Sequence, residues 1–200
     1  MKLLLIATTN PAKFEEAKAV LEDENLEILS FKDFSDIKQV EETGATFLEN
    51  AKLKAVGYFE QTKVPVIADD GGLIVDYLDG APGVNSHRWL GHEATDQELA
   101  GAIIEKMKGV PREKRVARLG GFIVFYDGGH WLEAENYIEG YIAEKLMGEI
   151  KPGFPYRPIL MVPKFGKPYA DLTHEEHEEV NFRRKNLKAL KPRIVKLLNG

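Results

Sequence analysis

Cysteine is absent from this sequence of 200 residues. Disulfides, thiolate metal sites and cysteine nucleophiles are therefore excluded, and the composition fits an intracellular protein, which we expect to be cytoplasmic. Long hydrophobic runs are also missing. The apolar run that follows Met1 and Lys2 is too short for a membrane span or for a secretion signal. We interpret this run as a first buried strand.

Positive charge is not in excess either. The chain has 27 Lys and Arg against 32 Asp and Glu, a formal net charge of −5, so it lacks the basic footprint that nucleic-acid polymers require. We therefore expect a small-molecule ligand, with neither a nucleic-acid polymer nor a membrane as partner. No internal repeat or low-complexity linker divides the chain, and its 44% hydrophobic content predicts one domain over residues 1–200.

The stretch from Pro65 to Arg88 carries the strongest chemical signal. A short apolar run, Val64 to Ala68, has the composition of a strand and is followed by Asp69, Asp70 and two glycines. Carboxylates at the end of a strand, beside glycines that let a ligand approach the backbone, are placed to hold a hard cation or to activate water. An Asp-Gly turn without a function is the competing interpretation.

A second polar segment follows the first strand, which we predict over Leu3 to Ala7. Pro11 suits the first turn of a helix, with Thr9 or Asn10 as its cap. The hydroxyls of Thr8 and Thr9, the amides at the start of the helix and the Lys13 ammonium can together hold a phosphate. Ordinary capping beside a surface lysine is the alternative.

Two acids precede the next predicted helix. Thr46 and Glu49 have the spacing of a capping box, which predicts a helix to about Glu60. Glu41 and Glu42 therefore lie on the approach loop. From there an acid can reach a metal, or it can simply be solvated.

The remaining pattern alternates between strands and helices. The predicted elements are a strand over 26–31, a helix over 95–107, a hairpin of strands over 115–126 and 130–142, a short strand over 159–162, a capped start at Thr173, and a basic helix over 183–196 that is broken or kinked at Pro192. The hairpin extends the sheet toward a second lobe. Before the short strand, Phe154 and Tyr156 stand in a rigid loop, where their rings either stack on a base or pack in the core.

Five segments in register resemble the inosine triphosphate pyrophosphatase family, also called the Ham1 family. The segments are ATTNPAK at 7–13, EETGATFLENAKLKA at 41–55, ADDGGL at 68–73, GAPGVNSHR at 80–88 and LTHEEHEEVNFRR at 172–184. The resemblance implies an α/β fold with an elongated mixed sheet, flanking helices and two lobes around a central cleft. It also implies a homodimer that uses Mg²⁺ to convert deaminated purine triphosphates to monophosphates and pyrophosphate.

The resemblance assigns roles to individual residues. It implies Thr8, Asn10 and Lys13 on the phosphates, Glu41 and Asp70 on the metal, and Asp70 as the base that deprotonates the attacking water. It makes Lys13 and Asp70 the catalytic pair. The other substrate-binding positions that it implies are Thr9, Gly71, Phe154, Tyr156, Arg157, His177, Phe182 and Arg183.

The half of the site that the resemblance assigns to the base departs from the family pattern. Phe-Gly-Tyr-Asp-Pro is replaced by residues 154–158, with Pro155 and Arg157 at the changed positions, while His177 replaces a lysine. Ser-His-Arg becomes Asn181-Phe182-Arg183. Because specific base readout depends on polar groups that pair only with the right base, these changes predict weak preference among purines, through stacking. The alternatives are a shifted ligand with an acidic or carbonyl group suited to Arg157, and ordinary base recognition with Arg157 pointing to solvent.

Two other function classes remain open from the residues. A nucleotide-binding protein that has lost turnover would act as a sensor or as an interaction subunit. A haloacid dehalogenase-type phosphatase is disfavoured, because its chemistry needs an Asp two residues before the second Asp, and position 68 is alanine.

Overall fold

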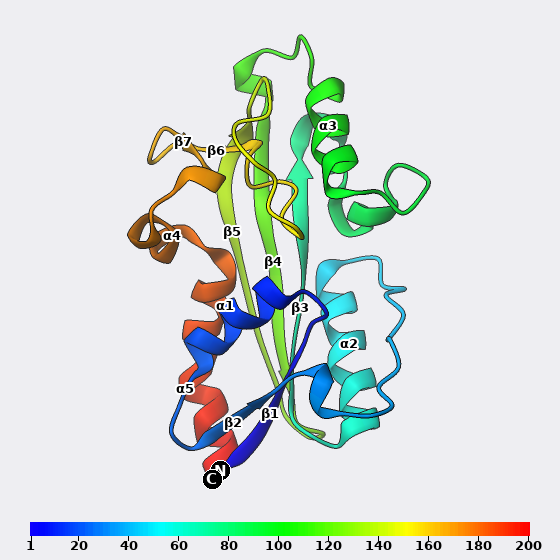
Figure 1. The fold of residues 1–200 in the computed structure, drawn as a ribbon, viewed down its shortest axis with the longest axis vertical. Coiled ribbons are helices and arrows are strands. Elements are labelled where there is room, and N and C mark those ends of the chain that lie inside the picture. Colours follow the sequence, from blue (N-terminus) through cyan, green and yellow to red (C-terminus); the bar gives the residue numbers. More distant parts are fainter. The chain divides into compact units, whose positions relative to one another are not determined.

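The computed structural model describes residues 1–200, with the side chain of His87 left aside. Its elements in chain order are β1 (Lys2–Ala7), α1 (Pro11–Leu21), β2 (Leu26–Leu29), α2 (Phe47–Thr62), β3 (Val66–Val75), α3 (Asp96–Lys106), β4 (Val116–Tyr126), β5 (Trp131–Ile142), β6 (Leu160–Val162), β7 (Lys167–Pro168), α4 (His174–Val180) and α5 (Phe182–Asn199). Figure 1 shows their course.

The strands form one seven-stranded sheet in the order β2-β1-β3-β4-β5-β6-β7. The strand β1 is parallel to β2 and to β3, whereas β6 is antiparallel to β5 and β7. The predicted α/β class with a mixed sheet is therefore confirmed. In the described part of the chain, no helix is both long enough and apolar enough to cross a membrane.

The chain divides into two compact units. The first comprises residues 1–70, 121–136 and 182–200, and the second comprises residues 71–120 and 137–181. The strands β3, β4 and β5 contribute residues to both. That residues 1–200 form one domain stays a prediction.

Both faces of the sheet are covered in the first unit. Leu4 and Ile6 of β1 pack with α1 and α5, while Leu5 and Ala7 pack with Ala51 and other residues of α2. Successive side chains of a strand point to opposite faces, so a continuous apolar run such as β1 fits a strand with helices on both sides. The helices α1 and α5 contact each other, as Figure 1 also shows.

The predicted helix starts are found. The Asn10 side chain accepts hydrogen bonds from the amides of Ala12 and Lys13 at the start of α1. Capping boxes begin three more helices, at Thr46, Thr95 and Thr173. The predicted hairpin is found as β4 and β5.

Two expectations from the sequence were wrong. The strand β3 continues to Val75, so Asp69 to Gly72 lie within the strand and neither form a turn nor follow the strand's end. Because β1 stops pairing with β3 at Ala68, the neighbour that remains in the sheet beyond that point is β4, and strand pairing there outweighs the weak turn preference of Asp-Gly.

The break expected at Pro192 is absent, since α5 is one helix from Phe182 to Asn199, while a kink there stays a prediction. Proline removes one backbone hydrogen bond, but buried Leu187, Leu190 and Ile194 lie on both sides of it. Their packing holds the helix together.

In the second unit, Arg115 fastens three segments together. Its buried guanidinium donates hydrogen bonds to the carbonyls of Ile142 (2.6 Å), Met107 (2.5 Å), Ala143 (2.5 Å) and Val110 (3.2 Å). The arginine thereby ties the start of β4 to the end of β5 and to the chain that follows α3.

Candidate active site

The acid pair of β3 stands where β1 ends. The pairing of β1 with β3 finishes at Ala7 opposite Ala68, and β3 alone continues into Asp69 and Asp70. The loop from Thr8 to Asn10 leaves the sheet at this point. The parallel arrangement therefore brings the phosphate-binding segment that the sequence predicts beside the acid pair.

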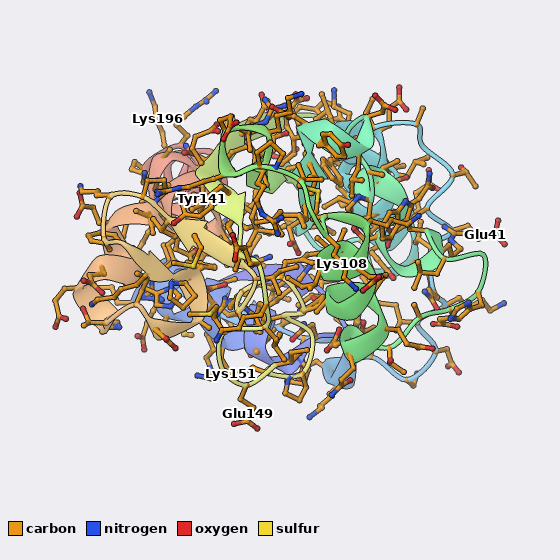
Figure 2. The ribbon with its side chains drawn as sticks, turned by 90° about the horizontal axis from the view of Figure 1, so that it is seen from above. Glu41, Lys108, Tyr141, Glu149, Lys151 and Lys196 are labelled. Atoms are coloured by element: carbon orange, nitrogen blue, oxygen red, sulfur yellow. The ribbon has the colours of Figure 1, made fainter. Side chains whose placement is uncertain are left out.

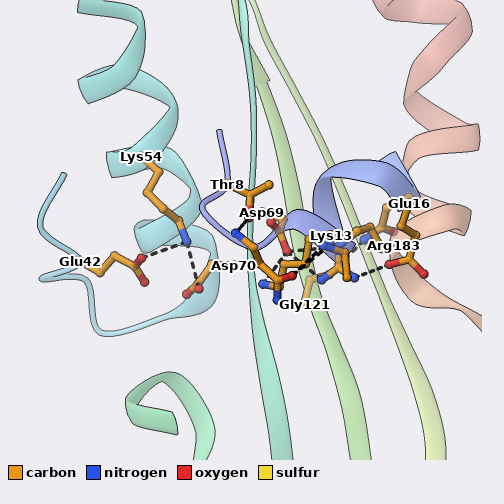
Figure 3. A network of polar contacts seen from close by, with 12 residues as sticks. Thr8, Lys13, Glu16, Glu42, Lys54, Asp69, Asp70, Gly121 and Arg183 are labelled. Carbon is orange, nitrogen blue, oxygen red and sulfur yellow. Dashed lines mark hydrogen bonds and ion pairs between the residues drawn. The ribbon is translucent and has the colours of Figure 1, made fainter. Parts of the chain in front are cut away.

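Asp69 is surrounded by cations. Its Oδ2 accepts a hydrogen bond from the Lys13 ammonium at 3.2 Å and from Nε and Nη2 of Arg183 at 3.3 and 2.9 Å. Arg183 also donates from Nη1 to Glu16 Oε2 at 2.6 Å. This buried network joins β3, α1 and α5, and Figure 3 shows it to the right of the strand.

Asp70 has a different environment, which α2 supplies. The Lys54 ammonium lies 3.2 Å from Asp70 Oδ1 and 3.3 Å from Glu42 Oε1. The second oxygen of Asp70 is buried and has no hydrogen-bond partner. Asp70 therefore keeps one oxygen available for a cation or a water molecule.

The two neighbouring carboxyls differ in pKa. Burial acts to raise the pKa of Asp69, but Lys13, Arg183 and Lys54 together hold it well below its usual range. Burial raises the pKa of Asp70, with Glu42 adding to the effect and Lys54 opposing it. Neighbouring acids with pKa values driven apart are typical of sites where one acid stays ionised and the other exchanges protons.

The cations of the site are shifted as well. Burial lowers the pKa of Lys13, and the nearby charges of Arg183 and Lys54 lower it further, whereas Asp69 acts to raise it. Burial also acts to lower the pKa of Lys54, but the surrounding carboxylates Asp70, Asp69 and Glu42 raise it overall. Lys54 therefore carries its charge firmly beside Asp70.

The structure separates the two acids of the approach loop. Glu42 reaches Lys54 beside Asp70, whereas Glu41 is exposed and extends outward at the edge of Figure 2. No cluster of three or more His, Cys, Asp or Glu suited to a metal occurs among the described residues. Mg²⁺ does not need one, because it commonly takes one or two carboxylates and completes its shell with waters and phosphates.

The loop before α1 has the expected local geometry. The Thr8 hydroxyl accepts from the Asn10 amide at 3.2 Å, and the Asn10 side chain caps α1. Thr9 is exposed. Lys13, one turn into α1, contacts Asp69, and phosphate binding by this segment stays a prediction.

The remaining positions that the resemblance assigns fall in different parts of the fold. Gly71 is partly buried within β3, and Phe182 is buried at the start of α5, where the guanidinium carbon of Arg183 lies 5.0 Å from its ring centroid. Tyr156 is buried in the second unit, and burial raises the pKa of its hydroxyl to about 12.

Arg157 does not point to solvent. The guanidinium carbon lies 3.6 Å from the centroid of Phe154 and 5.2 Å from that of Tyr169, and the Tyr169 ring in turn lies 4.6 Å from His177. Positions 157 and 177 thus belong to one chain of contacting groups, in which the Tyr169 and His177 rings are tilted by 51° to each other. One face of Phe154 is covered by the chain's own guanidinium.

Sequence reasoning missed Lys54, Glu16 and the position of Glu42. A signal for Lys54 was present, because it falls seven residues after Phe47 in α2. Phe47, Asn50 and Ala51 form the buried stripe of that helix. A lysine on a buried helical face needs an acidic partner. No local pattern marks Glu16, whose partner Arg183 is 167 residues away.

A family model described as the Ham1 family matches residues 4–193. The chain belongs to the Ham1 family. It is 39% identical over 201 residues to a dITP/XTP pyrophosphatase of Geobacillus kaustophilus, covering 100% of this chain and 98% of that protein. The dITP/XTP pyrophosphatase of Bacillus subtilis is 39% identical over 191 residues, covering 95% and 96%. The solved structure of a HAM1 protein from Coxiella burnetii superimposes with a TM-score of 0.85 at 30% identity, covering 98% and 100%.

Proposed function

We propose that this Ham1 family member hydrolyses nucleoside triphosphates of non-standard purines to the monophosphate and pyrophosphate. The two dITP/XTP pyrophosphatases that are 39% identical to this chain support the reaction class. The observation that carries the proposal is the acid pair of β3. The Asp69 carboxylate lies between cations that lower its pKa. Asp70 has one oxygen without a hydrogen-bond partner, and burial raises its pKa.

The site residues that lie in the first unit each have a role in this proposal. The Lys13 ammonium, the Thr8 and Thr9 hydroxyls and the Asn10 segment hold phosphate oxygens, while Asp69 and Glu16 keep the Lys13 and Arg183 side chains in place. Asp70 takes the proton from a water that opens the anhydride between the α- and β-phosphates. Its raised pKa makes it a stronger base than an ordinary aspartate.

The acids near Lys54 fit a magnesium ion. Asp70 has a buried oxygen without a partner, and the Glu42 carboxylate meets the same ammonium as Asp70. We therefore propose Glu42 and Asp70 as ligands, in place of the exposed Glu41. When bound there, Mg²⁺ would neutralise phosphate charge and lower the pKa of water.

The test measures pyrophosphate and orthophosphate released from inosine and xanthosine triphosphates with Mg²⁺. The parent should release pyrophosphate, and Asp70→Asn should lose about 10²- to 10⁴-fold or more in rate, because it removes the base and a metal charge. Asp70→Asn is nearly isosteric, so far-ultraviolet circular dichroism should be unchanged. Equal turnover by parent and variant would refute the role of Asp70.

A second candidate, nucleotide binding without turnover, is favoured by one observation. Arg157 covers a face of Phe154 and lies near Tyr169, whose ring contacts His177. Positions 157 and 177 depart from the pattern of the Ham1 family that the sequence resembles. Binding of inosine triphosphate in a calorimeter without any pyrophosphate release would select this candidate.

For base selectivity we propose a flat profile. Specific polar readout separates bases by about 100-fold or more, whereas stacking tolerates any base. We expect kcat/KM values for inosine, xanthosine, adenosine and guanosine triphosphates to lie close together in the parent. The triple change Arg157→Asp, His177→Lys and Phe182→His should raise the values for the deaminated purines. A parent that already prefers these by a hundredfold would contradict the proposal.

We further propose that the chain is a cytoplasmic homodimer. The resemblance to the Ham1 family supports it, as does the aromatic segment around Trp89, which is partly buried beside the Lys106 ammonium at 5.5 Å. Sedimentation at micromolar concentration should give twice the 22.5 kDa of one chain. A monomer would count against this proposal.

A further inference from the structure

Lys54 holds the two acids that the proposed function assigns to the metal. Its ammonium is within hydrogen-bond distance of Asp70 Oδ1 (3.2 Å) and 3.3 Å from Glu42 Oε1. Figure 3 shows the lysine reaching from α2 to both carboxylates. The side chains of Lys54 and Asp70 are only 12% and 14% exposed, so water screens this contact little.

The place of the ammonium is also the place a shared metal requires. A cation held jointly by Glu42 and Asp70 must lie between their oxygens, which is where the Lys54 nitrogen lies. Mg²⁺ draws its oxygen ligands to about 2.0–2.1 Å, and it would repel an ammonium that stayed on the same oxygens. The ammonium and the metal therefore compete for one position.

The second oxygen of Asp70 is a further ligand for the ion. Oδ2 is buried without a hydrogen bond while Oδ1 is held by Lys54. A divalent ion at this site gains in Oδ2 a ligand that no protein group has to surrender. The stronger charge of the ion then favours release of the lysine.

We propose that Lys54 is a resident counter-ion of the metal ligands and that a divalent ion must displace it to bind Glu42 and Asp70 together. The inference rests on the proposed function for the site of the metal, but it concerns the positioning role of Lys54. The lysine keeps the charges of Asp70, which is mostly buried, and of Glu42, which is partly exposed, compensated before the ion arrives. Compensation of this kind lowers the affinity of the protein for the ion.

The test titrates the nucleotide-free protein with Mn²⁺ alone and follows free Mn²⁺ by electron paramagnetic resonance. Lys54→Met removes the competitor and keeps the length of the side chain, so it should tighten Mn²⁺ binding about tenfold or more, within the usual range of coupling between ligands. A role limited to stabilising the fold would not tighten metal binding. Unchanged or weaker binding by Lys54→Met overturns the inference.

Two control variants separate displacement from a general charge effect. Lys13→Met removes a cation of the same site that contacts Asp69 but is not bonded to Asp70 or Glu42, and it should tighten Mn²⁺ binding much less. Lys52→Met removes a lysine of the same helix, α2, that pairs with Glu133 of β5 near the surface, and it should leave the affinity unchanged. Equal tightening by Lys13→Met and Lys54→Met would overturn displacement.

A crystal structure of the parent with Mn²⁺ tests the geometry without any variant. Anomalous scattering should place the ion on Glu42 and Asp70, with the Lys54 nitrogen beyond hydrogen-bond distance of both. An ion bound while Lys54 keeps its contacts, or no binding by either parent or Lys54→Met, contradicts the inference.

The two proposals fail in different ways. If Mn²⁺ displaces Lys54 but no triphosphate is converted to pyrophosphate, the proposed function fails and the displacement stands. If pyrophosphate is released while Lys54→Met leaves Mn²⁺ affinity unchanged, the function stands and the displacement fails.

Discussion

Replacing Asp69 by asparagine should destabilise the protein through the buried charge network. The change removes the carboxylate that Lys13 and Arg183 share, and it leaves two cations facing each other. Breaking a buried ion pair from one side costs about 3–5 kcal/mol of unfolding free energy. We expect the lower end, about 3 kcal/mol at pH 7, because Arg183 keeps Glu16 and asparagine keeps one acceptor oxygen.

The loss should depend on pH in a defined direction. The pKa of Asp69 is depressed in the folded protein, so its stabilising effect is complete above the unfolded value near 3.9 and declines as the pH falls toward the folded value. Below about pH 4 the folded carboxylate stays ionised while the unfolded one takes up a proton. The difference in unfolding free energy between the parent and Asp69→Asn should then narrow by up to about 1.4 kcal/mol per pH unit.

Urea unfolding followed by circular dichroism at pH 7, 5, 4 and 3 measures this difference. Lys52→Met is the matched control, because its pair with Glu133 is 40% and 34% exposed and should be worth under about 1 kcal/mol. A loss for Asp69→Asn no greater than that of the control would refute the reasoning. A difference that is constant from pH 7 to pH 3 would refute the assigned pKa direction.

Three further predictions concern other parts of the structure. Because burial raises the pKa of Asp70 in the metal-free protein, a nuclear magnetic resonance titration without metal should place the pKa of its carboxyl above the ordinary aspartate value of about 3.9. A pKa at or below that value would contradict the environment assigned to Asp70. Arg115→Met should cost about 3 kcal/mol or more in urea unfolding, because it leaves several buried carbonyls without a donor, and a loss below about 1 kcal/mol would contradict this. Gly140→Ala should destabilise the protein by about 1–3 kcal/mol, since the added Cβ would meet the Met161 carbonyl oxygen. Gly101→Ala in α3 has open space around the added Cβ and should stabilise the protein by about 0.4–1 kcal/mol. Thermal melts that reverse this order would disprove the packing argument.

Local sequence signals located most of the elements correctly. The helix caps at Asn10, Thr46, Thr95 and Thr173 depend on side chains within three residues of the backbone that they satisfy, so their spacing is visible in the chain. The signal failed at Asp69 to Gly72, where Asp-Gly resembles a turn. There the neighbouring strand β4 decided the conformation.

The resemblance to the Ham1 family named single residues of the candidate site, and their roles stay predictions. Lys13 and Arg183 both contact Asp69, whereas Asp70 pairs with Lys54. The resemblance did not reveal that Asp69 is held by two cations while one oxygen of Asp70 has no hydrogen-bond partner, because adjacent acids look equivalent in a sequence. Which of Glu41 and Glu42 faces Asp70 depends on the path of an irregular loop, and that path has no periodicity to read.

By itself, the sequence determined the α/β class, the capped helices and the residue types available for phosphate chemistry. These follow from spacing within a few residues and from local backbone satisfaction. Only the tertiary structure decided how the charges pair. Arg183 reaches Asp69 across 114 positions of the chain, and Lys54 reaches Asp70 from another helix. The strength of such pairs, and hence the pKa values of the two acids, depends on distance and burial, which only the folded chain defines.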